Sequence, residues 1–205
     1  MKRNIQITER DQKILREINR FGYADIQYIA SFFNWQPKLA YRRLLKLTQH
    51  GFLKHQQLLY GFPGIYWSTT LGKAISQDPL PTIRRINLNT FSHQLKTLHL
   101  SLALIAKHGG QFITEREIRQ SLGFTAIKEK RHIPDGLLLL DDKKIAIEVE
   151  LTVKSACRLE KIMRHYQRDF SYDQVWYYCG TPEVKNKIDR LRNNAEIVLT
   201  QLITS

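Results

Sequence analysis

Acidic residues, cysteines and long apolar runs are scarce in this chain of 205 residues. Its 19 Asp and Glu stand against 32 Lys and Arg, a formal net charge of +13. Such an excess attracts polyanions, and nucleic acid is the commonest of these inside a cell. No apolar run reaches the roughly 18 residues that cross a bilayer, so we expect no membrane partner. Residues 1–12 lack a stretch like the core of a signal peptide, which favours a cytoplasmic protein.

The two cysteines, Cys157 and Cys179, belong to no Cys-x-x-Cys pair or Cys/His knuckle. The sequence therefore predicts neither a structural zinc site nor a disulfide framework, and we expect both thiols in the core. Apolar residues make up 42% and charged residues 25%, which is ordinary for a globular protein. The length allows one large domain or two small ones.

The amino-terminal part predicts three short helices and a hairpin. Thr8 is placed to cap the first helix together with Asp11, and a second helix begins near Asp25. A third helix runs from Pro37 to about His50. The runs FLKHQQLLY and IYWSTT follow, joined by the turn GFPG, and this pattern is typical of a β-hairpin.

The third helix has two unlike faces. At about 100° per residue, Ala40, Leu44 and Leu47 share one side, while basic, polar and aromatic residues share the other. With this order of elements, AYRRLLKLTQHGFLKHQQ and IYWSTTLGKAI resemble the winged helix-turn-helix family. The resemblance implies a third helix in the major groove of double-stranded DNA and a hairpin on its backbone. The candidate contacts are Lys38, Tyr41, Arg42, Arg43, Lys46 and Gln49. A plain solvated helix face, or a winged helix that binds protein only, remains the alternative.

Composition and periodicity divide the chain into residues 1–78, a linker at residues 79–90 and a second domain at residues 91–205. The linker region contains two prolines and no clean periodicity. The second domain predicts the order α-β-β-β-α-β-α-β, with strands in QFITEREIR, HIPDGLLLL and IAIEVEL and a polar turn at DDKK. The fold class expected for the whole chain is α/β of the α+β kind.

The strand IAIEVEL carries an acidic face. Its period of two places Glu148 and Glu150 on one side, about 7 Å apart, and the hairpin would bring Asp135 beside them. Glu115 and Glu117 would share a face of the preceding strand in the same way. Clustered carboxylates repel one another, and hard oxygen ligands at this density suit Mg²⁺ or Mn²⁺.

The motif PDG…IEVELTVK resembles the PD-(D/E)xK nuclease superfamily, whose core runs α-β-β-β-α-β. The resemblance implies that Asp135 and Glu148 bind the metal, with Glu115 or Glu150 helping, and that the protein cuts DNA. Glu150 occupies the position of the family's lysine, and Lys154 is the nearest substitute. The expected catalytic set is therefore Asp135, Glu148, Glu150 and Lys154, and the expected metal ligands are Glu115, Asp135, Glu148 and Glu150.

The longer pattern EREIR…IPDG…IEVELTVKS resembles the MobC-type mobilisation proteins, also called the replication-relaxation family. Its members match here at Glu115 and Glu117, at Pro134 with Asp135, and at Glu148, Glu150 and Lys154. The resemblance implies plasmid or integrative-element DNA processing: binding near a transfer or replication origin and relaxing or nicking the DNA. It leaves open further relaxosome proteins and a second copy of the chain as partners.

Other functions remain open. The fold could bind origin DNA as a relaxosome accessory or replication factor without cutting it, or serve as a transcription regulator with a sensor domain. The usual relaxase chemistry is not predicted, because no His-x-His pair occurs. His93 and His99 are expected to be structural or DNA-facing. The carboxy-terminal tyrosines are expected to be core or surface aromatics rather than nucleophiles: Tyr166, Tyr172, Tyr177 and Tyr178.

Overall fold

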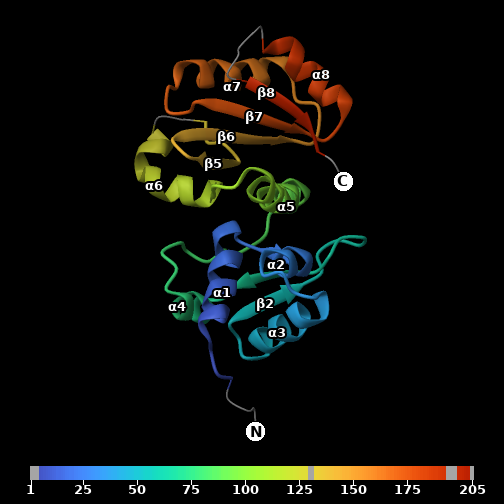
Figure 1. Ribbon diagram of the computed structural model, residues 1–205, viewed down its shortest axis with the longest axis vertical. Helices are drawn as coiled ribbons and strands as arrows, with labels where there is room; N and C mark the ends of the chain where they lie inside the picture. Colours follow the sequence, from blue (N-terminus) through green and yellow to red (C-terminus); the bar gives the residue numbers. More distant parts are fainter. Residues whose placement is uncertain (1–4, 129–131, 193–197, 204–205) are drawn as a thin grey trace. The chain divides into compact units, whose positions relative to one another are not determined.

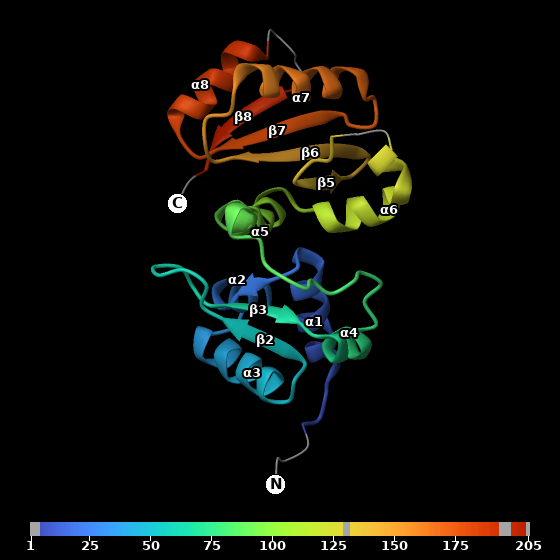
Figure 2. The same ribbon diagram turned by 180° about the vertical axis from the view of Figure 1, so that it is seen from behind.

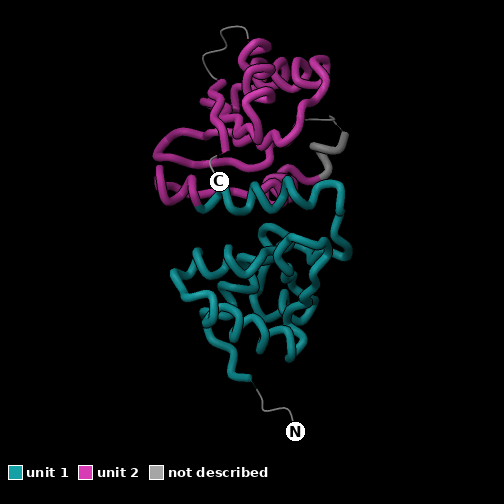
Figure 3. Tube along the Cα trace, turned by 90° about the vertical axis from the view of Figure 1, so that its right-hand side faces the viewer, with its two compact units in different colours: residues 1–102 teal, residues 103–205 magenta. Residues whose placement is uncertain are grey.

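The computed structural model of the chain describes residues 5–128, 132–192 and 198–203. The chain divides into two compact units, residues 1–102 and 103–205 (Figure 3). Within the described ranges there are eight α-helices and two β-sheets, so the expected mixture of helix and strand is confirmed. No helix of this described part is both long and apolar enough to span a membrane.

The first unit combines short helices with a small antiparallel sheet of order β1-β3-β2 (Figure 1). Its elements are α1 (Glu9–Phe21), β1 (Ala24–Asp25), α2 (Ile26–Phe32), α3 (Pro37–Gln49), β2 (Leu53–Gln56), β3 (Ile65–Ser68), α4 (Thr70–Ser76), the 3₁₀ turn η1 (Leu88–Thr90) and the first part of α5 (Phe91–His108). The three predicted helices and the hairpin are therefore confirmed, and α4 is an addition that the sequence analysis did not predict.

Local side-chain caps explain where the first two helices begin. The Thr8 amide donates to Asp11 Oδ2 (2.8 Å), and the Asp11 amide donates in return to Thr8 Oγ1 (3.4 Å). This is the reciprocal capping box that the sequence predicts. Asp25 caps α2 by accepting the Tyr28 amide (2.7 Å). Gly22 ends α1 with a φ of 87°, a conformation that favours glycine.

The core of the first unit lies between α1, α3 and the hairpin. Ile14 and Ile18 of α1, Leu44 and Leu47 of α3, and Ile65 of β3 are all fully buried. The apolar side of α3 predicted from its periodicity is thus confirmed. Because that side is used for packing, the opposite side of α3 faces solvent.

An ion pair fastens α3 to α1. The Arg43 guanidinium grips both carboxylate oxygens of Asp11, which is 1% exposed, and also donates to the Gln6 carbonyl oxygen (3.1 Å). Burial alone would raise the pKa of Asp11, but the hydrogen bonds from Arg43 and Thr8 outweigh it and lower that pKa. Asp11 therefore serves two purposes, because it caps α1 and anchors α3.

Residues 79–90, expected as a linker, belong to the first compact unit. The Asn19 side-chain amide donates to the Leu80 carbonyl oxygen (3.0 Å), and Leu80 itself is buried. The boundary between the units follows Leu102, inside α5. The hydrophobic spacing of α5 predicts a helix correctly, but it carries no mark of where one unit ends and the next begins.

The second unit contains one five-stranded sheet of order β4-β5-β6-β7-β8 (Figures 1 and 2). The first three strands are antiparallel and the last three are parallel. Its elements after α5 are β4 (Gln111–Thr114), α6 (Glu115–Lys128), β5 (Gly136–Leu140), β6 (Lys143–Glu150), α7 (Ala156–Arg168), β7 (Gln174–Cys179), α8 (Pro182–Leu191) and β8 (Val198–Leu202). The start of the predicted last strand, residues 195–197, lies outside the described residues.

The strand expected over QFITEREIR ends at Thr114, and Glu115 begins α6. The prediction that Glu115 and Glu117 share a strand face is therefore wrong. The reason is local: the Thr114 amide donates to Glu117 Oε2 (2.8 Å), and the Glu117 amide donates to Thr114 Oγ1 (3.3 Å). A Thr-x-x-Glu pattern is the sequence signature of such a helix start, and here it outweighs the strand-like residues before it.

The predicted hairpin between β5 and β6 is confirmed. Leu140 pairs with Lys143 across a turn in which Asp141 has a φ of 49°. Along β6 both faces are buried from Ile145 to Glu150. One face, with Ala146, shares a core with α7, α8, β7 and β8, which includes Leu159 and Val184. Glu148 and Glu150 lie on that same face by the period of two.

Replacing Arg43 with Met should destabilise the protein by about 3 kcal/mol at neutral pH, because it leaves the buried Asp11 carboxylate unpaired. The matched control is Arg42→Met, one residue away on the exposed side of α3, where a change within about 0.5 kcal/mol is expected. The Asp11 pKa is lowered in the folded state, so the pair stabilises at neutral pH and its contribution is lost as pH falls through that pKa. Urea unfolding at a series of pH values from neutral to acid measures the free energy of unfolding of each variant. Equal losses of stability in Arg43→Met and Arg42→Met would contradict the role of the Arg43–Asp11 pair.

Candidate functional site

The acidic residues predicted for β5 and β6 converge in the second unit. Asp135 directly precedes β5, and the pairing of Gly136 with Ile147 places it beside the Glu148 region of β6. Asp135 Oδ2 accepts the Val149 amide (2.8 Å), so it is fixed to the neighbouring strand. Glu148 and Glu150 are 5% and 4% exposed. The three carboxylates therefore form one cluster, and it is largely withdrawn from water.

Glu148 lies at the centre of this cluster. Its Oε1 accepts a hydrogen bond from the Tyr166 hydroxyl of α7 and lies 2.6 Å from His132 Nε2. Burial raises the pKa of Glu148, and the charge of Asp135 raises it further, while His132 and Tyr166 act in the opposite direction. Burial would lower the pKa of His132, but its hydrogen bond to Glu148 and the nearby carboxylates raise it. The pair therefore holds a proton to higher pH than an isolated histidine would.

Glu150 is paired with Lys154, the lysine that the sequence analysis expects at the site. Lys154 Nζ lies 2.5 Å from Glu150 Oε2, so the chain turns back after β6 and brings the amine to the cluster. The Lys154 carbonyl oxygen accepts a hydrogen bond from Lys187 of α8 (2.7 Å), which fixes this turn. The amine thus stands at the side chain of residue 150, two positions after Glu148.

A buried hydroxyl completes the cluster. Tyr177 lies on β7 directly opposite Glu148, is 1% exposed, and its hydroxyl oxygen has no hydrogen-bond partner among the described residues. Burial raises the pKa of Tyr177 strongly, and the charges of Glu148, Glu150 and Asp135 raise it further. An unsatisfied buried hydroxyl costs roughly 1–3 kcal/mol, so a ligand or solvent oxygen that met it here would be favoured.

The cluster has the oxygen chemistry that divalent ions prefer, but fewer ligands than the sequence predicts. Among the described residues, no group of three or more His, Cys, Asp or Glu side chains could hold a metal ion. Glu115 is paired with Arg119 on α6 (2.5 Å), and Glu150 with Lys154. Asp135 and Glu148, themselves bound by the Val149 amide and by His132 and Tyr166, are the two carboxylates that the hairpin places side by side. Mg²⁺ is commonly bound by one or two carboxylates together with phosphate oxygens and water, so this pair fits such an ion when a phosphate is present.

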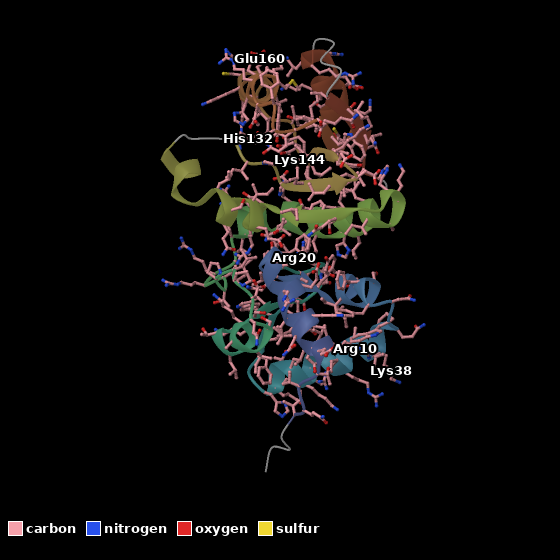
Figure 4. The ribbon with its side chains drawn as sticks, turned by 60° about the vertical axis from the view of Figure 1, so that its left-hand side comes forward. Arg10, Arg20, Lys38, His132, Lys144 and Glu160 are labelled. Atoms are coloured by element: carbon pink, nitrogen blue, oxygen red, sulfur yellow. The ribbon has the colours of Figure 1, made fainter. Side chains whose placement is uncertain are left out.

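The candidate DNA face on α3 is exposed. Five of the six predicted contacts are solvent-exposed on the side opposite the core: Lys38, Tyr41, Arg42, Lys46 and Gln49. Figure 4 locates Lys38 on α3 in the first unit. Two exposed leucines, Leu39 and Leu45, lie among these residues, so the face is both basic and partly apolar. Such a surface can contact phosphates and base edges together.

Arg43, the sixth predicted contact, is placed differently. Its guanidinium binds the buried Asp11, so it belongs to the packing between α3 and α1 rather than to the exposed face. The helical period explains this, because Arg43 is only about 60° of rotation from the Ala40, Leu44 and Leu47 side. Arg42 and Arg43 are adjacent in the sequence, and only their different rotation about the helix axis separates an exposed position from a packing position.

Burial and contacts settle further predictions for the cysteines, for His99 and for three of the tyrosines. Cys179 is buried as expected, but Cys157 is exposed near the start of α7, so the prediction of two buried thiols is wrong for Cys157. His99 Nε2 lies 2.7 Å from the buried Asp25 and is structural within the first unit. The tyrosines Tyr166, Tyr177 and Tyr178 are buried, as expected for core aromatics.

Sequence reasoning missed His132 and Tyr166 as members of the site. His132 lies three residues before Asp135, at the start of the predicted strand HIPDGLLLL, and only the folded chain brings it to Glu148. Tyr166 shares the buried side of α7 with Leu159 and Met163, so its spacing predicts a core residue and not a hydrogen-bond donor. The signal that a partner was needed was Glu148 itself, because a buried anion must be compensated.

Comparisons with known protein families, curated proteins and solved structures gave no match to this chain. The family resemblances of its motifs therefore stay expectations. The inference of function starts from the side chains of the acidic cluster and of α3.

Glu148→Gln should lower the pKa of His132, because it removes the carboxylate charge while burial of the imidazole remains. The matched control is Glu160→Gln on the exposed side of α7, which makes the same charge change elsewhere (Figure 4). Since the pKa of His132 is raised above 6.5 in the folded state, the pair stabilises below that pH, and its contribution is lost as pH rises through the raised pKa. NMR titration of His132 measures the shift, and an unchanged value in Glu148→Gln would rule out the pairing.

Proposed function

We propose that this chain is a DNA-processing protein of plasmid or integrative-element mobilisation or replication. In this proposal the first unit is a winged helix that binds origin DNA, and the second is a PD-(D/E)xK-like domain that relaxes or nicks it. The observation that carries DNA binding is the basic, exposed side of α3 on a helix whose other side is fully packed. The net charge of +13 supports the same partner.

The order of elements in the first unit supports the winged helix. Three helices precede an antiparallel hairpin, and a short third strand, β1, pairs with β3 on the other side. In this arrangement α3 is the helix that would enter the major groove. Lys38, Arg42 and Lys46 would contact phosphates, while Gln49 and Tyr41 are placed for base edges or sugar.

The second unit supports the nuclease-like part. Leaving α6 aside, α5, β4, β5, β6, α7 and β7 follow the order α-β-β-β-α-β of that superfamily. Asp135 directly precedes β5 and Glu148 lies on the adjacent β6, and in this proposal they take the positions of the superfamily's two acids. Lys154 brings its amine to the side chain of Glu150. In this proposal it takes the place of the lysine that the superfamily pattern has at that position.

Each residue of the cluster has a role in this proposal. Asp135 and Glu148 would hold Mg²⁺ or Mn²⁺, which supplies the positive charge that activates water and stabilises a phosphodiester under attack. Lys154 would stabilise negative charge on the phosphate, and its pairing with Glu150 keeps the amine at the site. His132 and Tyr166 orient the Glu148 carboxylate. The Tyr177 hydroxyl is available to donate to an incoming oxygen.

The second candidate is a relaxosome accessory or replication factor that binds DNA and does not cut it. The observation that favours it is that each acid already has a partner. Glu148 is paired with His132, Glu150 is paired with Lys154, and Asp135 accepts the Val149 amide. In such a protein these contacts would stabilise the sheet and nothing more. Both candidates share DNA binding through α3 and differ only in the second unit.

Combined Arg42→Ala and Lys46→Ala should weaken binding to origin DNA and flatten its salt dependence. Each lost phosphate contact lowers the slope of log affinity against log salt by roughly 0.9. The control is Lys96→Ala, an exposed lysine on the part of α5 that belongs to the same unit, which should leave the slope unchanged. Fluorescence anisotropy over a series of salt concentrations measures both values. If the double variant matches the wild type in affinity and slope, α3 is not the DNA face.

Asp135→Asn should abolish nicking of supercoiled plasmid in Mg²⁺ or Mn²⁺, with a loss of about a hundredfold or more. Asparagine keeps an oxygen that can accept the Val149 amide, so the strand pairing is retained while the charge is lost. Glu115→Gln is the control, because Glu115 lies on α6 and pairs with Arg119, and its activity should remain. The assay follows conversion of supercoiled plasmid to open circles.

The outcomes separate the two candidates. Nicking by Asp135→Asn at the wild-type rate would assign the activity to another site or to a contaminant. A folded wild-type protein that binds origin DNA but nicks none of the transfer- or replication-origin plasmids would leave the accessory function as the one supported.

A further inference from the structure

The loop between β2 and β3 differs in chemistry from the rest of this basic protein. Residues 57–64, with the sequence QLLYGFPG, contain no charged side chain in a chain of net charge +13. The loop projects from the first unit in Figures 1 and 2. Without a cation it cannot bind phosphate oxygens through ion pairs. The side chains that this loop offers are uncharged, and apart from Gln57 they are apolar or aromatic.

The ring of Tyr60 is fully exposed at the end of this loop, with a relative accessibility of 101%. The next aromatic residue behaves in the opposite way. Phe62 folds back, and its ring lies 5.5 Å from that of Phe91 at an angle of 63°, within the same unit. Gly61 lies between them with a φ of 78°, a conformation that a side chain rarely adopts, and this reverses the chain direction.

Backbone contacts hold the loop in this form. The Phe62 amide donates to the Leu59 carbonyl oxygen (3.3 Å), and the Gln57 side-chain amide donates to the Phe62 carbonyl oxygen (3.3 Å). The backbone of Tyr60 therefore lies in a closed turn that is anchored at Phe62. A tyrosine ring has only two side-chain torsions to fix, so little entropy is lost when it binds a flat partner.

We propose that Tyr60 is a base-stacking residue, whose ring stacks on a nucleobase that has left the helical stack while α3 holds the duplex. This rests on the proposed DNA binding and adds a preference for distorted DNA. Every nucleobase offers a flat face, and an aromatic side chain stacks on it without needing charge. Apolar wedges of this kind act on DNA where base steps are opened. The uncharged loop and its outward ring match that chemistry and not phosphate binding.

Binding of the full chain to two origin duplexes tests the inference. One duplex is fully paired, and the other carries a central 2-aminopurine opposite an abasic site, so that the base can leave the stack. The proteins are the wild type, Tyr60→Ala, Tyr60→Phe and Phe170→Ala. Phe170 is the matched control, because it is 95% exposed but lies after α7 in the other unit.

Tyr60→Ala should bind the duplex with the unpaired base about 5- to 150-fold more weakly, and should lose the change in 2-aminopurine fluorescence. Tyr60→Phe should behave as wild type, since the ring does the stacking. The salt slope should not change in either variant, because no phosphate contact is removed. A smaller loss on the paired duplex would identify an unpaired base as the target, whereas an equal loss on both duplexes would overturn the inference, because the ring would then contribute without an unstacked base.

The inference is overturned if Tyr60→Ala and Phe170→Ala bind alike, or if Tyr60→Phe is as weak as Tyr60→Ala. These results leave DNA binding through α3 intact. Failure of the wild type to bind either duplex removes the proposed function, and the inference with it, so the two failures are distinguishable. Because Tyr60 is fully exposed, thermal unfolding of its variants should match that of the wild type.

Discussion

Glu148 and Glu150 are buried in the middle of a sheet, and their need for compensating partners determines the polar contacts around β6. β6 is covered on both faces, so an anion on it loses most of its hydration, at a cost of several kcal/mol unless neighbours compensate. The compensation comes from separate places in the chain: His132 before β5, Tyr166 on α7 and Lys154 after β6. The contacts that stabilise the sheet and the groups proposed to process DNA are thus the same atoms. A simple apolar strand would fold at less cost.

In the second unit the two glutamates of β6 are buried, whereas in the first unit α3 carries charged groups on its exposed side. Three cations of α3, Lys38, Arg42 and Lys46, stand on its exposed side, where water solvates them, whereas Arg43 of the same helix is turned toward the buried Asp11. Adjacent arginines therefore have different roles: Arg42 faces solvent, and Arg43 fastens the helix to α1. The DNA-binding proposal depends on this division, because a helix that contacts phosphates must itself be held firmly. The Asp11 carboxylate supplies that attachment.

Features set by neighbours in sequence could be predicted, and those set by distant contacts could not. Thr8 with Asp11, the turn at Asp141 and the apolar side of α3 all follow from local spacing, and the structure confirms them. The acids of β5 and β6 also converge as predicted, because a hairpin is a local structure. The β-prone residues before Glu117 favour a strand in the sequence, and the Thr-x-x-Glu signal outweighs them in the fold. Tyr166 and His132 meet Glu148 only through tertiary folding, and no spacing could have revealed them.

The hydrogen bond from Arg43 to the Gln6 carbonyl oxygen has a practical consequence. It ties Gln6, ahead of α1, to Arg43 of α3, so a purification tag or fusion partner joined at the amino end is connected to the chain a few residues before this contact. If α3 binds DNA as proposed, a bulky or acidic tag at that end would compete with the nucleic acid. Samples for binding studies should have such additions cleaved, or should carry them at the other end of the chain.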